Sequence, residues 1–225
     1  INQADFVACH NESYITKYNM VQDIKPGGTF LLNCQWEHEE LDKHLPGQVK
    51  RYIAENNIKF YTINGVKIGK EIGLGNRINT VLQSAFFKLA NIIPIDDAIK
   101  YMKDAATASY SKKGEAIVKM NHDAIDAGCQ QVHEVKVPAS WKKCKDTPMG
   151  MPAAKCADKT LQDFVNNIQI PCNAQEGDKL PVSTFTGMAD GTFPQGSAAF
   201  EKRGIAVDVP AWNGDNCIQC NFCSY

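Results

Sequence analysis

The chain has little net charge and no long apolar segment. It has 24 Lys and Arg residues and 25 Asp and Glu residues, so its formal net charge is −1. This balance gives no general electrostatic attraction to nucleic acid or to an anionic membrane surface. The most apolar stretch, residues 84–95, is short and is interrupted by Lys88 and Asn91. We therefore expect neither nucleic acid nor a membrane among the partners.

The sequence also lacks a first Met, because it begins at Ile1, and it lacks a charged-then-apolar leader. We expect both ends to be breaks in a longer polypeptide. The apolar fraction of 44% and the charged fraction of 22% are ordinary for a globular protein. A length of 225 residues allows one or two domains with a sizeable core.

Cysteine is abundant, with nine residues, and six of the nine show no metal-type spacing. We interpret these six as small buried side chains in a reducing interior, because a disulfide scaffold is typical of small secreted proteins. They are Cys9, Cys34, Cys129, Cys144, Cys156 and Cys172.

The other three, Cys217, Cys220 and Cys223, are spaced three residues apart near the end of the sequence. This spacing is the front half of the bacterial-ferredoxin pattern Cys-x2-Cys-x2-Cys-x3-Cys-Pro, in which a short loop wraps one corner of a cubane cluster. The fourth Cys of that pattern would follow Tyr225, the last residue given. The sequence therefore predicts three ligands of a 4Fe-4S cluster.

Two other readings of these thiols stay open. A structural zinc site also uses Cys-x2-Cys, but normally with a second, distant pair of ligands. The thiols could instead have no ligand at all. Three clustered cysteines cannot all pair with one another as disulfides, so a disulfide framework is the weakest explanation.

The first 142 residues alternate between apolar runs and helical patterns. Short strands are expected at residues 5–9, 29–34 and 58–63, and helices at 16–24, 48–56 and 78–91, with Lys25-Pro26-Gly27-Gly28 as a break. Such alternation predicts an α/β fold with βαβ units, a parallel sheet and additional helices. Ligands bind at the carboxyl ends of parallel strands, so residues 9–11 and 33–36 are candidate contact points.

The composition changes after residue 142, where Pro, Gly and Lys become frequent. We expect a connector at residues 143–158 and a small, irregular joining domain at 159–211. A helical turn or two at 160–167 and short strands at 180–185 and 205–209 are predicted there. Residues 212–225 are the expected start of a ferredoxin-like domain.

Several runs of sequence carry a resemblance to one family. The joining region has GDKLPVS at 177–183, DGTFP at 190–194 and FEKRGIA at 200–206, followed by Trp212 and the cysteine run. Upstream lie ACHN at 8–11, GGTFLLN at 27–33 and GLGNRIN at 73–79. Together they resemble the gamma-type domain, the "EKR" domain and the first cluster loop of single-chain pyruvate:ferredoxin (flavodoxin) oxidoreductases, in the order of that family.

The resemblance implies oxidative decarboxylation of pyruvate to acetyl-CoA and CO2 on thiamine diphosphate and Mg²⁺. Electrons would pass through 4Fe-4S clusters to ferredoxin or flavodoxin. The thiamine-binding and acid–base residues of the family lie outside these 225 residues, so no catalytic residue is assigned and the segment alone is expected to be inactive. The full-length enzyme would be a homodimer, in the cytoplasm or in a hydrogenosome-type organelle. The alternatives are an oxidoreductase for another 2-oxoacid and a stand-alone iron–sulfur electron-transfer or scaffolding protein.

Overall fold

The computed structural model describes residues 3–201 and 210–224. Within these ranges, no helix has the length and apolar character needed to cross a membrane. The helices are α1 (Leu41–His44), α2 (Gly47–Glu55), α3 (Gly65–Ile72), α4 (Asn79–Ala90), α5 (Ile95–Tyr110), α6 (Glu115–Gln130), α7 (Lys159–Phe164) and α8 (Ile170–Asn173). Short 3₁₀ turns join several of these elements.

The sheet has four strands in the order β1-β2-β3-β4. β1 pairs with β2 and β2 with β3 in parallel, whereas β3 and β4 are antiparallel. The predicted α/β class with a mainly parallel sheet is confirmed. The strands are β1 (Ala4–Cys9), β2 (Ile24–Asn33), β3 (Lys59–Ile63) and β4 (His133–Glu134).

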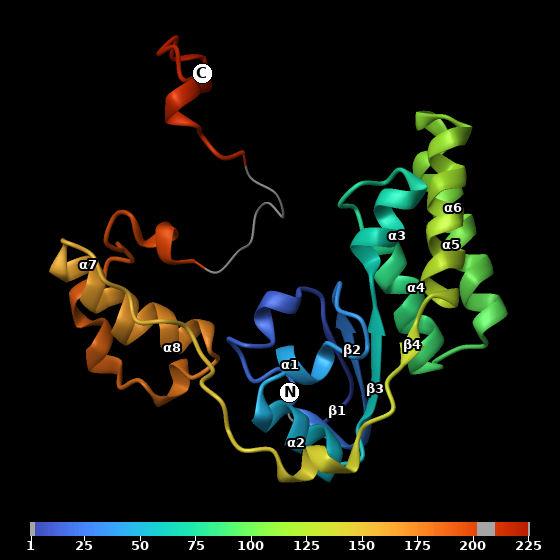
Figure 1. The fold of residues 1–225 in the computed structure, drawn as a ribbon, viewed down its shortest axis with the longest axis horizontal. Helices are drawn as coiled ribbons and strands as arrows, with labels where there is room; N and C mark the ends of the chain where they lie inside the picture. Colours follow the sequence, from blue (N-terminus) through green and yellow to red (C-terminus); the bar gives the residue numbers. More distant parts are fainter. Residues whose placement is uncertain (1–2, 202–209, 225) are drawn as a thin grey trace.

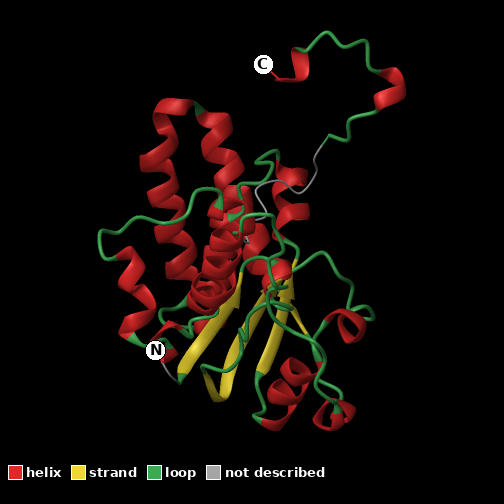
Figure 2. Ribbon diagram, turned by 90° about the vertical axis from the view of Figure 1, so that its left-hand side faces the viewer, coloured by secondary structure: helices red, strands yellow, loops and turns green. Residues whose placement is uncertain are grey.

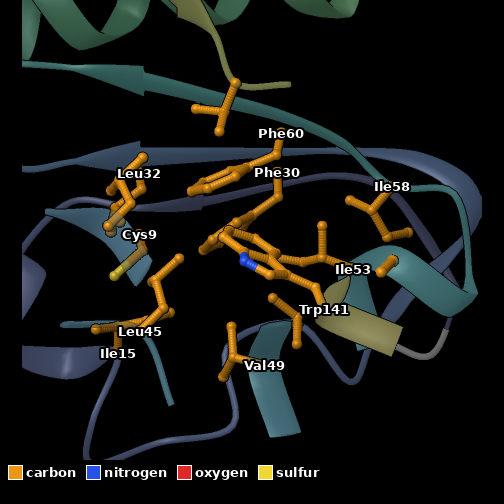
Figure 3. Close-up of a cluster of buried hydrophobic side chains, with 14 of the residues drawn as sticks. Cys9, Ile15, Phe30, Leu32, Leu45, Val49, Ile53, Ile58, Phe60 and Trp141 are labelled. Carbon is orange, nitrogen blue, oxygen red and sulfur yellow. The ribbon is translucent and has the colours of Figure 1, made fainter. Parts of the chain in front are cut away.

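Helices cover both faces of this sheet (Figures 1 and 2). Side chains of a parallel strand alternate between faces, so Phe30 and Leu32 of β2 enter one core and Leu31 enters the other. The first core, with α1, α2 and Trp141, has the Phe30 and Phe60 rings stacked with centroids 5.6 Å apart (Figure 3). The second core lies under α3, α4 and α6, with α5 packed on the outside.

Helices α4 and α6 cross at very short range because Gly128 has no side chain. A Cβ atom built on Gly128 would lie 2.0 Å from Ser84 Oγ and 2.3 Å from the Val81 carbonyl oxygen. Lys88 of α4 then donates to the Cys129 carbonyl oxygen at 2.5 Å, which places a cation at the C-terminal end of α6. The predicted packing of residues 78–91 on the sheet is confirmed, since Val81 and Leu82 lie in the second core.

Two predictions near β2 are wrong. Residues 16–23 form turns and bends after a short 3₁₀ helix, Glu12–Tyr14, and Ile24 is the first residue of β2, so the helix predicted at 16–24 is absent. Pro26, Gly27 and Gly28 do not break the chain but lie inside β2, where the β1–β2 register shifts between Ala4 and Phe6. Gly27 has φ +76, a conformation open to glycine, so the run forms an irregularity within the strand.

The first part of the connector, residues 144–147, lies along α2. The hydroxyl of Thr147 accepts a hydrogen bond from the Gly47 N–H at 3.0 Å, and the Gln48 side chain bonds the Thr147 backbone in both directions. Arg51 donates to the Cys144 carbonyl oxygen and pairs with Asp146. Because Pro46 offers no side-chain cap, Thr147 satisfies the first free N–H of α2 from a distant part of the sequence.

The joining region is mainly helical where the structure describes it. α7, a π-helical turn at Val165–Gln169 and α8 follow one another without a break, which is longer than the predicted turn or two. The Asn166 side chain bonds both the N–H and the carbonyl of Ala154, closing a small core with Leu161. The strand predicted at 180–185 is wrong: Val182–Met188 is a 3₁₀ helix. The strand predicted at 205–209 lies outside the described residues.

Candidate functional site

The three clustered cysteines lie in the C-terminal segment, which extends away from the rest of the chain (Figure 1). Cys217, Cys220 and Cys223 are free and exposed. Cys217 and Cys220 lie between two 3₁₀ turns, Gly214–Asn216 and Phe222–Ser224, and Cys223 lies within the second turn. Thiols in such a position are open to a metal or a cluster from solvent.

The backbone between these cysteines bends sharply. Gln219 and Asn221 have φ values of 55 and 61, in the left-handed region that non-glycine residues seldom occupy. The Gln219 N–H donates to Cys217 Sγ at 3.4 Å. A backbone donor aimed at a ligating sulfur stabilises its thiolate form and is one of the features that set a cluster's reduction potential.

The residues of this loop suit an iron–sulfur cluster in type and spacing. Thiolates hold such clusters, and Cys217, Cys220 and Cys223 would supply three of the four ligands. In the described part of the chain, no three His, Cys, Asp or Glu side chains are grouped closely enough to hold a metal ion. Ligation by Cys217, Cys220 and Cys223 would therefore require their sulfur atoms to move closer together. Thiolates are also ligands of zinc, so the donor atoms alone do not separate the two.

The other six cysteines fall into three groups: three are buried, Cys144 and Cys156 are partly buried, and Cys172 is exposed. Cys9, Cys34 and Cys129 are buried, and burial raises the pKa of Cys9 to about 12 and that of Cys34 to about 11. Thiols with such pKa values stay protonated at neutral pH and are poor nucleophiles and ligands. The interpretation of these three as buried packing residues holds. It is wrong for Cys172, which is exposed.

A second feature lies at the carboxyl ends of β2 and β3. The buried Asn33 side chain donates to the His10 carbonyl oxygen at 2.9 Å and accepts the Gly65 N–H at 2.8 Å. It thereby joins the loop after β1 to the first turn of α3. Of the two loops predicted as contact points, the one after β1 is held by this bridge, and its residues do not line the neighbouring pocket.

That pocket, with a volume of about 240 Å³, is lined partly by the loop after β2. The His38 and His133 rings meet edge to face with centroids 6.2 Å apart, and Trp36 stacks on His44. Lys67, from the first turn of α3, also lines it. The sequence predicted Trp36, because it lies in the loop that follows a predicted strand. It gave no signal for His38, His133 or Lys67.

Two family models match separate parts of the chain. A family model described as "Pyruvate ferredoxin/flavodoxin oxidoreductase" matches residues 1–131, and the EKR model, described as a domain of unknown function, matches 153–206. The chain is 51% identical to pyruvate:ferredoxin oxidoreductase of Moorella thermoacetica and 49% identical to pyruvate-flavodoxin oxidoreductase of Enterobacter agglomerans. Both matches cover 100% of this chain but 18% and 19% of the relatives, so it spans about one fifth of their length.

Among solved structures, the crystal structure of pyruvate oxidoreductase subunit PORC from Thermotoga maritima is similar over 60% of this chain and 67% of that one, with 16% identity and a TM-score of 0.46. The family assignment depends on the sequence matches. The model of the first family covers more than half of the chain. The chain belongs to the pyruvate ferredoxin/flavodoxin oxidoreductase family.

Proposed function

We propose that these 225 residues are one segment of a longer pyruvate:ferredoxin or pyruvate:flavodoxin oxidoreductase. The observation that carries the proposal is the match of the whole chain, at about half identity, to enzymes of that name. In our division, 1–142 is the C-terminal part of the gamma-type domain, 143–158 a connector and 159–211 the EKR joining domain. Residues 212–225 begin a 4Fe-4S ferredoxin domain.

In the proposed reaction, pyruvate and the thiol of coenzyme A give acetyl-CoA, CO2, one proton and two electrons. Thiamine diphosphate with Mg²⁺ would supply the carbon chemistry from parts of the enzyme outside this segment. Two one-electron acceptor molecules, ferredoxin or flavodoxin, would take the electrons. We further propose a homodimer in the cytoplasm; none of the relatives named above supports a hydrogenosome-type organelle.

The chain's own contribution would be at the electron-transfer end of this reaction. Cys217, Cys220 and Cys223 would hold one cluster, which transfers single electrons when bound. In two-cluster ferredoxins the fourth Cys of such a motif binds the other cluster, so the last ligand here would come from elsewhere in the longer protein. The Gln219 N–H would stabilise the ligating sulfur of Cys217, since it already donates to it.

The test is Cys220→Ala in the full-length enzyme, with Cys172→Ala as a matched control because Cys172 is also exposed. The first variant should lose pyruvate-dependent reduction of ferredoxin or flavodoxin and keep the decarboxylation half-reaction, measured as release of labelled CO2. It should also contain less iron and acid-labile sulfide per protomer and lose one signal in the electron paramagnetic resonance spectrum after reduction.

Two results would contradict the proposal. Unchanged carrier reduction in Cys220→Ala would show that these thiols are not on the electron path. A colourless protein carrying zinc at this loop would overturn the cluster assignment, even if the family's reaction is present elsewhere in the enzyme.

A further inference from the structure

A pocket of about 710 Å³ lies between the β1–β2 connection and the helical stretch formed by α7 and α8. We call it the aromatic pocket and define it by Tyr14, Tyr18, Asn19, Phe164, Asn173 and Phe193, which all line it. In Figure 1 the α8 end of the helical stretch points toward the β1–β2 connection. The volume is within the range of about 300–1,000 Å³ typical of small-molecule sites.

Aromatic rings form both walls of the aromatic pocket. On the side of the sheet, the Tyr14 and Tyr18 rings meet edge to face with centroids 5.8 Å apart. On the opposite side, Phe164 and Phe193 have centroids 5.4 Å apart. Phe193 is 63% exposed although it is a large apolar ring. Rings on two opposed walls favour a flat ligand, because a planar π-system can contact both.

Carboxamides are the most frequent polar groups of the aromatic pocket, beside the hydroxyls of Tyr14, Tyr18 and Ser197 and the carboxylates of Asp23 and Glu201. Asn19, Gln22, Asn173 and Gln175 each offer an N–H donor and a carbonyl acceptor, and Asp23 adds an acceptor. Among the described residues that line it, none is Lys, Arg or His. Anionic groups such as phosphate are usually bound by Arg or Lys, so this lining disfavours them.

We propose that the aromatic pocket binds an uncharged planar heterocycle that carries an amine or amide N–H edge, the class to which the base of a purine nucleoside belongs. The aromatic walls would stack on its faces, and the carboxamides would pair with its edge as Asn and Gln pair with adenine in nucleic-acid recognition. This site is independent of the proposed reaction. Pyruvate and the phosphates of coenzyme A are anions, and the lining residues that the structure describes offer them no counter-charge.

The test uses adenosine as the probe and the 225-residue chain, with binding measured by isothermal titration calorimetry. Phe193→Ala should raise the dissociation constant about fivefold or more, because a stacked base loses one aromatic partner. Phe222→Ala is the matched control, since Phe222 is 77% exposed and lies outside this lining, and it should leave the constant unchanged. Circular dichroism of both variants checks that the fold is intact.

Two related ligands sharpen the result. Purine riboside, which lacks the 6-amino group, should bind more weakly than adenosine if the carboxamides read the N–H edge. AMP should also bind more weakly, because its phosphate would face Asp23. The proposal is overturned if adenosine shows no saturable binding at millimolar concentration, if AMP binds more tightly, or if Phe193→Ala binds adenosine as well as the unaltered chain.

Discussion

The sheet domain (residues 3–142) and the cysteine segment (residues 210–224) contain similar apolar residue types. These residues are buried in the sheet domain and exposed in the cysteine segment. In the sheet domain, Phe30 and Leu32 are fully buried between β2 and the helices that cover it. In the cysteine segment, Trp212, Ile218 and Phe222 are 73%, 84% and 77% exposed. An apolar pattern thus becomes regular structure where a second layer covers it, and the cysteine segment has no such layer among the described residues.

The largest expected effect tests this contrast directly. Phe30→Ala should lower the free energy of unfolding by about 3–5 kcal/mol, because it leaves a cavity beside the stacked Phe60 ring. Phe222→Ala should change it by less than about 0.5 kcal/mol. Urea unfolding followed by circular dichroism measures both. A similar loss in the two variants would mean that the cysteine segment is packed in solution.

The second-largest expected effect on stability comes from replacing a glycine of the sheet domain, and a glycine of the joining region serves as its control. Gly128→Ala should cost about 1–3 kcal/mol, because the new methyl group would overlap Ser84 Oγ and the Val81 carbonyl oxygen at the α4–α6 crossing. Gly187→Ala is the control in the joining region, since a Cβ there meets no atom within 4 Å. It should be neutral to slightly stabilising. Equal stabilities of the two variants would exclude a tight helix crossing.

Alkaline pH should weaken the sheet domain through its buried thiols. Burial raises the folded-state pKa of Cys9 from 9.0 to about 12 and that of Cys34 to about 11, so above pH 9 the unfolded chain has lost protons that the folded chain keeps. This contribution to stability is complete below pH 9. It falls as pH rises toward 11–12, by about 1.4 kcal/mol per pH unit for each thiol.

The matched variants isolate this effect from other groups that titrate in the same range. Cys9→Ala should reduce the slope of unfolding free energy against pH, between pH 9 and 11, by about 1.4 kcal/mol per pH unit. Cys172→Ala, which removes an exposed thiol, should leave the slope unaltered. Identical slopes in the two variants would place Cys9 in contact with water.

The smallest effect concerns the connector. Thr147→Val should cost about 1 kcal/mol, because the hydroxyl that accepts the Gly47 N–H is lost and α2 has no cap of its own. Thr186→Val removes an exposed hydroxyl that donates only to the Ser183 carbonyl three residues back, so it should stay within about 0.5 kcal/mol. If Thr147→Val is also neutral, the connector does not cap α2 in solution.

Most of the sheet domain could be predicted because its elements carry their own patterns. The apolar periods of residues 48–56 and 78–91 agree with α2 and α4, and the β-branched run at 58–63 agrees with β3. The Pro-Gly-Gly run was misread as a break because its place beside β1 depends on a neighbour distant in sequence. The 3₁₀ helix Val182–Met188 has a strand-like composition, but no strand lies beside it within residues 3–201 and 210–224, and local bonding such as that of the Thr184 N–H to the Pro181 carbonyl oxygen prevails.

The candidate sites also differ in how far the sequence alone predicts them. The spacing of Cys217, Cys220 and Cys223 is visible in the sequence because all three ligands lie on one loop. His38 and His133 meet only because β4 pairs with β3 in the antiparallel direction, which the sequence pattern did not specify. The aromatic pocket likewise joins residues from opposite ends of the chain, and only the tertiary structure brings them together.

The close approach of the connector to α2 has one more consequence. A Cβ on Gly47 would lie 1.8 Å from the Lys145 carbonyl oxygen, and Gly150 donates its N–H to the Thr16 carbonyl oxygen at 3.0 Å. The chain thus stays in contact with the sheet domain as far as residue 150. Any movement of the cysteine segment relative to the sheet domain must therefore arise in residues after 150, because the residues before that point are held against α2 and against the β1–β2 connection.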